Sequence, residues 1–129
     1  MSEKFSAEII SPNRSLVKIE TTEVTIPSFE GEMGILKDHI PLITFLRPGI
    51  IKIKDQIDKK FYVEEGTVEF SNNNLLILTS TAKELSAIDK SSLETLINDA
   101  EKKLSGDEAT DKERYLLSYK LSTLKKISL

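Results

Sequence analysis

The chain carries one histidine, His39, and it stands directly after Asp38. A histidine beside a carboxylate is a combination that general acid–base catalysis uses. On a strand, however, adjacent side chains point to opposite faces, and the sequence has no Gly-x-Ser-x-Gly elbow that would supply a nucleophile. We therefore favour a loop or interface position for His39 over a catalytic role, and we expect no catalytic residue.

Other patterns that carry chemistry are weak. The chain has no cysteine, which excludes disulfides, thiol nucleophiles and cysteine-ligated metals. Its carboxylates are scattered and show no metal-ligand spacing, and no phosphate-binding loop of the Gly-x-x-x-x-Gly-Lys-Ser/Thr type is present. Gly31 and Gly34 form a bare Gly-x-x-Gly, which some RNA-binding folds use, but with an acid inside it a tight loop between strands is favoured. We expect no metal, no cofactor and no nucleic acid.

Charge is unevenly distributed along the chain. The net charge of −3 argues against nucleic acid as the main partner. No acidic residue follows Arg114, so the chain ends in a basic segment that contains Arg114, Lys120, Lys125 and Lys126. Such a segment is suited to an acidic partner. It is also the pattern of a solvated helix face whose lysines complement the negative end of the helix dipole.

The first two thirds of the sequence alternate apolar and polar residues with period two, which is typical of strands. The clearest alternating segments are residues 5–9, 16–20, 24–26, 51–54, 61–64, 68–70 and 75–78. Turn signals separate them, such as Ser11-Pro12-Asn13 and the run from Ser71 to Asn74. Short strands at this spacing predict an all-β sandwich or barrel.

Beyond Ala82 the apolar residues follow the period of a helix. Two stripes result, the first made of Leu93, Leu96, Ile97, Ala100 and Leu104, the second of Leu117, Leu121 and Leu124. Asp89 and Ser91 are equally good N-caps for the first helix. Gly106 is expected to end it in the left-handed conformation, and Thr110 with Glu113 offers a capping box for the second.

The expected fold class is α+β, with an N-terminal antiparallel β-sandwich over residues 1–85 and a C-terminal antiparallel two-helix hairpin over residues 86–129. Burying a leucine contributes roughly 1.5–3 kcal/mol, whereas ordering the backbone costs about 1–2 kcal/mol per residue. Because each helix has few large apolar residues, we expect the docked hairpin to be close to energetic balance. Packing against another protein is then able to compete with docking.

Nothing in the sequence predicts direct insertion into a membrane. The first five residues, MSEKF, lack the basic and apolar regions of a secretory signal. The apolar stretch from Ile40 to Ile53 is interrupted by two prolines and two basic residues, and it is shorter than the ~20 apolar residues that span a bilayer. We expect contact with a membrane only through another protein.

Residues 31–43, GEMGILKDHIPLI, and 46–49, LRPG, are the most specific part of the chain. They resemble the signature of the epsilon subunit of F-type ATP synthases, a G-E-x-G-I-L-P-x-H-x-P-L run followed by a K-P-G turn. The resemblance extends, in the family's order and spacing, over residues 66–70, 76–82 and 88–89.

The resemblance implies a non-catalytic subunit of a rotating central stalk that couples the gamma subunit to the c-ring during proton-driven ATP synthesis. In that family the sandwich contacts gamma and the polar loops of the c-ring. The hairpin folds against the sandwich or extends along gamma into the catalytic alpha/beta head, where it blocks ATP hydrolysis. The implied location is peripheral, on the cytoplasmic face of the bacterial inner membrane, with a plastid-encoded chain as the alternative.

The resemblance also implies contact residues. Those facing the c-ring or gamma are Glu30, Gly31, Glu32, Met33, Gly34 and His39. Among them Glu32 offers an anionic group to polar loops, and the glycines allow a partner to approach the backbone closely. Inhibitory contacts with the catalytic head are implied for Arg114, Lys120, Lys125 and Lys126, each contributing on the order of 0–1 kcal/mol.

Two departures from the family pattern change what is expected. Lys37 and Asp38 stand where the family often has Pro-Gly, so this turn differs in detail. Members that bind ATP as a regulator carry I-D-x-x-R-A, but here Ser92 and Leu93 replace the arginine and the alanine, and a phosphate-binding guanidinium is lost. An ATP-sensing module remains the alternative function, and a small β-sandwich hydrolase outside the family is a third.

Equilibrium dialysis of the full chain against ATP separates the first two hypotheses. We expect no binding at submillimolar ATP, because Ser92 cannot supply the missing positive charge. Saturable binding in that range would favour the nucleotide-sensing module.

Overall fold

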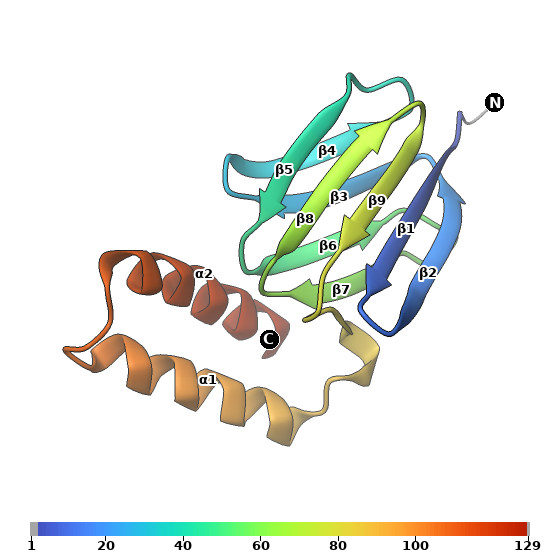
Figure 1. The fold of residues 1–129 in the computed structure, drawn as a ribbon. Coiled ribbons are helices and arrows are strands. Elements are labelled where there is room, and N and C mark those ends of the chain that lie inside the picture. Colours follow the sequence, from blue (N-terminus) through green and yellow to red (C-terminus); the bar gives the residue numbers. More distant parts are fainter. Residues whose placement is uncertain (1–2, 129) are drawn as a thin grey trace.

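The computed structural model describes residues 3–128. Met1, Ser2 and Leu129 lie outside the described residues, so the expectation about an N-terminal signal falls partly outside them. The described chain contains the strands β1 (Phe5–Ser11), β2 (Arg14–Thr21), β3 (Glu23–Ser28), β4 (Gly31–Leu36), β5 (Leu42–Leu46), β6 (Gly49–Ile53), β7 (Lys59–Val63), β8 (Gly66–Ser71), β9 (Asn74–Leu78) and β10 (Lys83–Glu84). A 3-10 turn, η1 (Leu85–Ala87), leads into helices α1 (Lys90–Ser105) and α2 (Asp111–Ser128). The helices lie side by side at one end of the strands (Figure 1).

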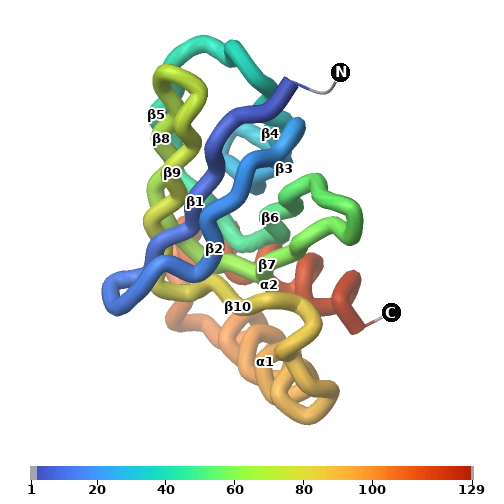
Figure 2. Tube along the Cα trace, turned by 90° about the vertical axis from the view of Figure 1, so that its right-hand side faces the viewer, coloured from blue at the N-terminus to red at the C-terminus, as the bar shows by residue number. Residues whose placement is uncertain are grey.

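The strands form one hydrogen-bonded sheet that folds over into two layers (Figure 2). Their order is β10-β7-β6-β3-β5-β8-β9-β1-β2, with β4 paired to the remaining edge of β3. The layers join at β3 and β5, where Ser28 pairs with Leu46 and the N–H of Arg47 donates to the carbonyl of Pro27 over 2.9 Å. Among the described strands β1 and β9 run parallel, and the other pairs are antiparallel.

The core lies between the two layers and follows directly from the alternation of each strand. In β1, for example, Phe5, Ala7 and Ile9 are buried while Glu8 between them is not. Phe5 meets Phe70 edge to face, with ring centroids 5.6 Å apart, a favourable arrangement of two aromatic rings. The other buried residues of this core are Val24, Ile26, Ile35, Leu46, Ile51, Ile53, Phe61, Val63, Val68, Leu75 and Ile77.

Two turns of the sandwich depend on particular residues. In the β8–β9 turn Asn72 and Asn73 have φ angles of 50° and 59°, a left-handed conformation in which asparagine is enriched. At the start of β6, a Cβ added to Gly49 would collide with the ring of Pro27. Only glycine therefore fits where the β5–β6 turn, which carries Arg47, crosses β3.

The helix N-caps agree with the sequence. Asp89 caps α1, since its carboxylate accepts a hydrogen bond of 2.7 Å from the N–H of Ser92. This bond lowers the pKa of Asp89 below its ordinary value. At α2, Thr110 and Glu113 form the reciprocal capping box, with bonds of 3.0 and 3.1 Å. Of the two N-caps considered for α1, the structure thus uses Asp89.

The C-terminal end of α1 differs from the expectation. Gly106 has φ −79° and ψ 159°, so the prediction of a left-handed glycine is wrong. The guanidinium of Arg114 instead donates to the carbonyls of Leu104 and Gly106, at 2.8 and 2.6 Å. A side chain of α2 satisfies the carbonyls that a left-handed glycine would have helped to satisfy.

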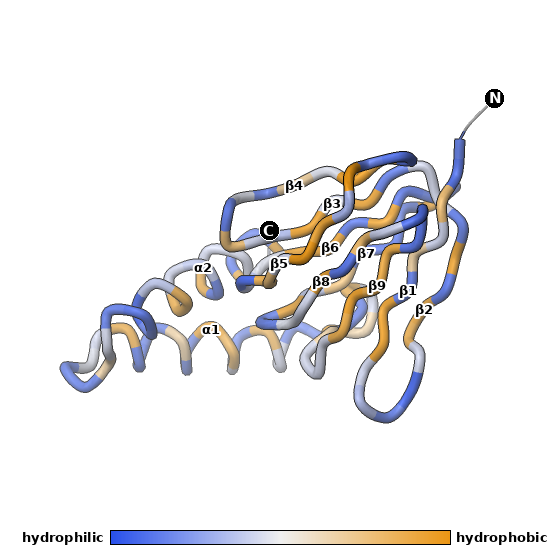
Figure 3. Tube along the Cα trace, turned by 45° about the horizontal axis from the view of Figure 1, so that its top comes forward, coloured by the Kyte–Doolittle hydropathy of each residue, from blue (hydrophilic) through white to orange (hydrophobic). Residues whose placement is uncertain are grey.

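The hairpin docks on the outer face of β6 and β7. Tyr62 points out of the sandwich, yet it is only 1% exposed because Leu93 and Leu124 cover it. Its hydroxyl donates to Glu64 over 2.9 Å, and burial together with that carboxylate raises the pKa of Tyr62. Partly buried side chains surround this contact, namely Ile88, Leu96, Ile97 and Ile127. Hydrophobic and hydrophilic residues accordingly alternate along both helices (Figure 3).

The expected α+β architecture, a β-sandwich followed by a two-helix hairpin, is confirmed. The parallel β1–β9 pair is the detail that period-two patterns did not indicate, because alternation fixes which face a residue takes and not the direction of its neighbour.

Candidate functional site

Strand β4 carries most of the contact residues that the sequence singled out. Gly31 to Gly34 belong to this strand, so the expectation of a tight loop between strands at this motif is wrong. Among the described strands it pairs only with β3, so its other edge is open. Glu32 and Gly34 are exposed, whereas Met33 between them packs against the core. The structure therefore spreads these residues along one edge strand and turns Met33 inward instead of gathering them in a cluster.

The β3–β4 turn presents Glu30 and Gly31. The hydroxyl of Ser28 donates to the carbonyl of Gly31 over 2.7 Å and accepts from the N–H of Glu30 over 3.2 Å. The Glu30 carboxylate accepts a 3.3 Å bond from the hydroxyl of Thr44. Gly31 has φ 120°, and no other atom lies within 4 Å of the position of a Cβ. Glycine is required here by conformation, and the space beside it is open to a partner.

A pair of hydrogen bonds holds the β4–β5 loop to the β8–β9 turn. Asp38, at φ 66°, donates its backbone N–H to the side-chain oxygen of Asn73 over 2.7 Å. The side-chain nitrogen of Asn73 donates back to the Asp38 carboxylate over 3.0 Å. This loop and this turn lie at the end of the sandwich opposite the helices (Figure 1). We call the two bonds the Asp38–Asn73 clasp.

His39 is held in the same loop as a packing residue. Its ring meets the ring of Phe70 edge to face, with centroids 6.0 Å apart, and its Nδ1 lies 2.7 Å from the carbonyl of Ile40. The Asp38 carboxylate bonds Asn73, and the described residues show no hydrogen bond between it and the imidazole. Residues 3–128 also hold no group of three or more histidine, aspartate or glutamate side chains placed to bind a metal ion.

The outer face of β5, β8 and β9 carries exposed apolar side chains, and the hairpin borders it at one end, where Lys112 and Leu116 of α2 line a hollow with Phe45 and Thr67. Cross-strand pairing places Phe45, Thr67 and Leu78 in one row and Ile43, Glu69 and Leu76 in the next. Ile43 is 75% exposed, Phe45 57% and Leu78 45%. We define this surface, centred on Ile43, Phe45 and Leu78, as the open apolar face.

Sequence reasoning missed the open apolar face. In β5 the apolar residues Ile43 and Phe45 are exposed, while Thr44 between them is buried and bonded to Glu30. An apolar–polar alternation is normally assigned with its polar member outward. The available signal was that β5 has apolar residues at both alternating positions, since Leu42 and Leu46 flank the same segment.

The basic residues of α2 are mostly engaged within the chain. Lys120 lies 3.1 Å from the Glu64 carboxylate on the sandwich, and Lys125 lies 3.5 Å from Glu101 on α1. Arg114 bonds the end of α1, as described above. Lys126 is exposed and belongs to none of the ion pairs found among residues 3–128. The structure therefore does not gather the four into one exposed patch.

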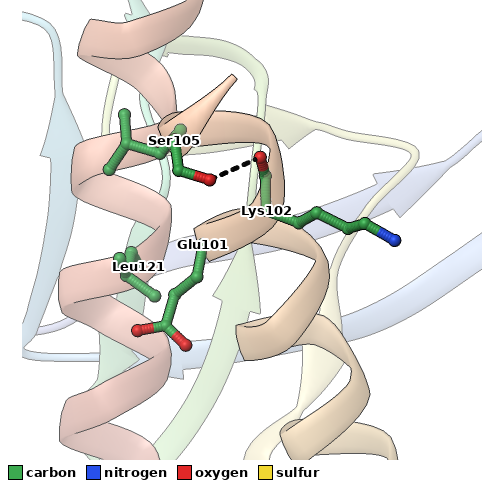
Figure 4. Close-up of a pocket in the computed structure, with 5 residues that line it drawn as sticks. Glu101, Lys102, Ser105 and Leu121 are labelled. Carbon is green, nitrogen blue, oxygen red and sulfur yellow. Dashed lines mark hydrogen bonds between the residues drawn. The ribbon is translucent and has the colours of Figure 1, made fainter.

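A hollow between the two helices does not resemble a ligand site. It is lined by Glu101, Lys102, Leu104, Ser105 and Leu121, and the side chain of Lys102 points away from α2 (Figure 4). Its polar groups do not converge on a common point, as they would around a bound small molecule. The candidate functional surfaces are the edge of β4 with its loop, the open apolar face and the hairpin.

Comparison with known proteins gives a consistent result. Residues 4–85 match the family described as "ATP synthase, Delta/Epsilon chain, beta-sandwich domain". The chain is 48% identical to the ATP synthase epsilon chain of Pelagibacter ubique, over 99% of this chain and 100% of that one. It is 32% identical to the ATP synthase epsilon chain of Rhizobium meliloti, over 98% and 95% of the two chains.

Solved structures share the fold. A chain from the Euglena gracilis mitochondrial ATP synthase aligns over 95% of this chain and 78% of its own, with TM-score 0.74 and 21% identity. A chain from the central stalk and c-ring of the Tetrahymena thermophila enzyme aligns over 99% and 98%, with TM-score 0.69 and 15% identity.

Neither helix among residues 3–128 is long and apolar enough to cross a bilayer.

The Asp38–Asn73 clasp predicts a difference between two adjacent asparagines. In Asn73→Gly the backbone keeps its freedom at positive φ but both clasp bonds are lost, so exchange of the Asp38 amide hydrogen should accelerate about three- to tenfold. Asn72→Gly is the matched control, because Asn72 shares the turn and the positive φ without a side-chain bond to the loop. Hydrogen exchange followed by NMR measures both, and equal rates would show that the clasp does not hold the loop.

Proposed function

We propose, because this chain belongs to the ATP synthase epsilon-chain family, that it is a non-catalytic central-stalk subunit that couples gamma to the c-ring during proton-driven ATP synthesis. The observation that carries the proposal is the open apolar face on a rigid sandwich. Patches of exposed Ile, Phe and Leu on one sheet mark sites of protein contact. The proposed location is the cytoplasmic face of a bacterial inner membrane, where partner subunits hold the chain.

The gamma subunit is the proposed occupant of the open apolar face. Ile43, Phe45 and Leu78 project from three neighbouring strands, so their positions are fixed by the sheet and little conformational entropy is lost when a partner covers them. Large apolar side chains at the centre of an interface commonly contribute most of its binding energy. A surface of this kind suits a contact that must transmit torque without yielding.

The c-ring is the proposed partner of the exposed side of β4 and of the β4–β5 loop. Glu32 offers a carboxylate, Gly31 and Gly34 leave the backbone accessible, and the clasp at Asp38 holds the loop in place. Glu30 lies at the other end of β4, and His39 supports the loop from inside. Met33 contributes through the core and not by direct contact.

The hairpin, residues 86–129, is proposed to be a mobile brake on ATP hydrolysis, separate from the sandwich of residues 1–85. When it leaves the sandwich, Lys120 loses Glu64 and becomes available, with Lys126, to acidic groups of the catalytic alpha/beta head. Arg114 bonds two carbonyls at the end of α1, so it reaches that head only if the two helices also separate. The exposed Lys125–Glu101 pair can exchange its partner without such a separation. The ATP-sensing alternative gains no support from Asp89, whose carboxylate caps α1.

Binding to gamma tests the sandwich part of the proposal. Ile43→Ser with Phe45→Ser should weaken binding about tenfold or more, because both anchors of the face are lost. Ile57→Ser is the matched control, since Ile57 is an isoleucine with 86% exposure at the β6–β7 turn, away from this face. Titration calorimetry measures the affinity of purified gamma for the parent chain, the double variant and the Ile57→Ser control. Unchanged affinity of the double variant for gamma would show that gamma does not bind this face.

Truncation after Leu85 tests the brake. The shortened chain keeps every strand and loses both helices, so it should still assemble with gamma. ATP hydrolysis by the complex should rise, because no hairpin can enter the catalytic head. A complex that assembles but hydrolyses ATP at the parent rate would remove the inhibitory role and leave the stalk role intact.

A further inference from the structure

Three kinds of contact fasten α2 to the sandwich. Towards the C-terminal end of α2, Leu124 packs on Tyr62. One turn earlier, Lys120 pairs with Glu64. In the N-terminal half two tyrosines, Tyr115 and Tyr119, meet the β5–β6 and β3–β4 turns. The third contact is aromatic and cationic, and nothing in the sequence pattern indicated it.

Arg47 is the centre of this third contact. Its guanidinium carbon lies 3.9 Å from the centre of the Tyr119 ring, and its Nη1 donates to the hydroxyl of Tyr115 over 3.2 Å. The two tyrosines are one helical turn apart, with ring centroids 4.9 Å apart. The ring of Phe29, from the β3–β4 turn, stacks on Tyr115 at 6.0 Å and 10°.

The backbone of Arg47 is held in place, whereas its guanidinium has no carboxylate partner among the ion pairs of residues 3–128. Its backbone N–H bonds the carbonyl of Pro27, and the buried Pro48 and Gly49 follow it. Among the ion pairs of residues 3–128, none includes Arg47. A guanidinium above an aromatic face, without a carboxylate, is stabilised mainly by the ring it covers. If the hairpin leaves, Arg47 loses both of its partners at once.

We propose that Arg47 is the latch of the docked hairpin, a residue that sets how often α2 leaves the sandwich without contributing to the stability of the sandwich itself. Its regulatory meaning rests on the function proposed above, whereas the latch is a property of the isolated chain. Arg114 has a separate role, since its bonds to Leu104 and Gly106 lie within the hairpin and survive undocking of the two helices as a unit. Undocking and separation of the helices are thus controlled by different arginines.

The absence of cysteine from the sequence provides a clean reporter. Thr123 lies one turn beyond Tyr119 on the same face of α2 and is 9% exposed. In a full-length Thr123→Cys chain the thiol is protected while the hairpin is docked, so its rate of labelling by a thiol reagent follows the undocked fraction. Arg47→Ala in this background should raise the labelling rate about three- to tenfold, because it removes one cation–π contact and one hydrogen bond.

The control and the second variant separate the latch from general destabilisation. Arg14→Ala removes an exposed arginine from β2 whose side chain takes part in none of the ion pairs found among residues 3–128, and it should leave the labelling rate unchanged. Tyr119→Leu should raise the rate, and adding Arg47→Ala to it should have a smaller effect than in the parent, because the two residues share one contact.

Two results would overturn the proposal. One is an Arg47→Ala chain that labels at the parent rate. The other is an equal acceleration at a thiol in the sandwich core, placed by Val68→Cys at a position with 0% exposure, which would mean that Arg47 stabilises the whole chain. Neither measurement involves gamma, the c-ring or ATP, so failure of the latch is distinguishable from failure of the stalk function.

Discussion

The folding of one sheet over itself into two layers is the constraint from which the rest of the molecule follows. When the sheet folds over at Ser28 and Leu46, each strand buries one side of its alternating pattern and turns the other outward. The outward sides are not uniformly polar. Tyr62 on β7 and the group around Phe45 on β5 are large apolar residues outside the core. The hairpin covers Tyr62, whereas Ile43, Phe45 and Leu78 stay exposed.

The hairpin covers its face with contacts that are easily exchanged. Leu93, Ala100 and Leu124 are its buried apolar residues, so burial contributes little compared with the ordering of two helices. Much of the remaining attachment comes from ring stacking, a cation over a ring and an ion pair. Contacts of this type depend on geometry more than on area, and a different protein surface can offer the same kind.

The sequence was sufficient for the fold class, because alternation with period two and apolar stripes with period 3.6 are strong signals over many residues. The caps Asp89, Thr110 and Glu113 also fit standard patterns, whereas strands β4 and β5 were not assigned. The sequence was insufficient where a residue's role depends on a distant partner. The clasp joins Asp38 to Asn73 across 35 positions, and Arg114 replaces the left-handed glycine at the end of α1. Local patterns carry no information about such pairs. The contact residues along β4 remain predictions that only a partner can test.

The position of Arg47 links the sandwich to the hairpin. It sits in the turn that joins β5, which carries the open apolar face, to β6, which lies under the hairpin. Pro27 and Gly49 fit together so closely that this turn cannot shift without disturbing the junction between the layers. A force applied to the open apolar face is therefore carried by the sheet to the residue that holds α2. Because interiors packed at this density transmit strain, the two outer faces are mechanically connected through one short, stiff turn.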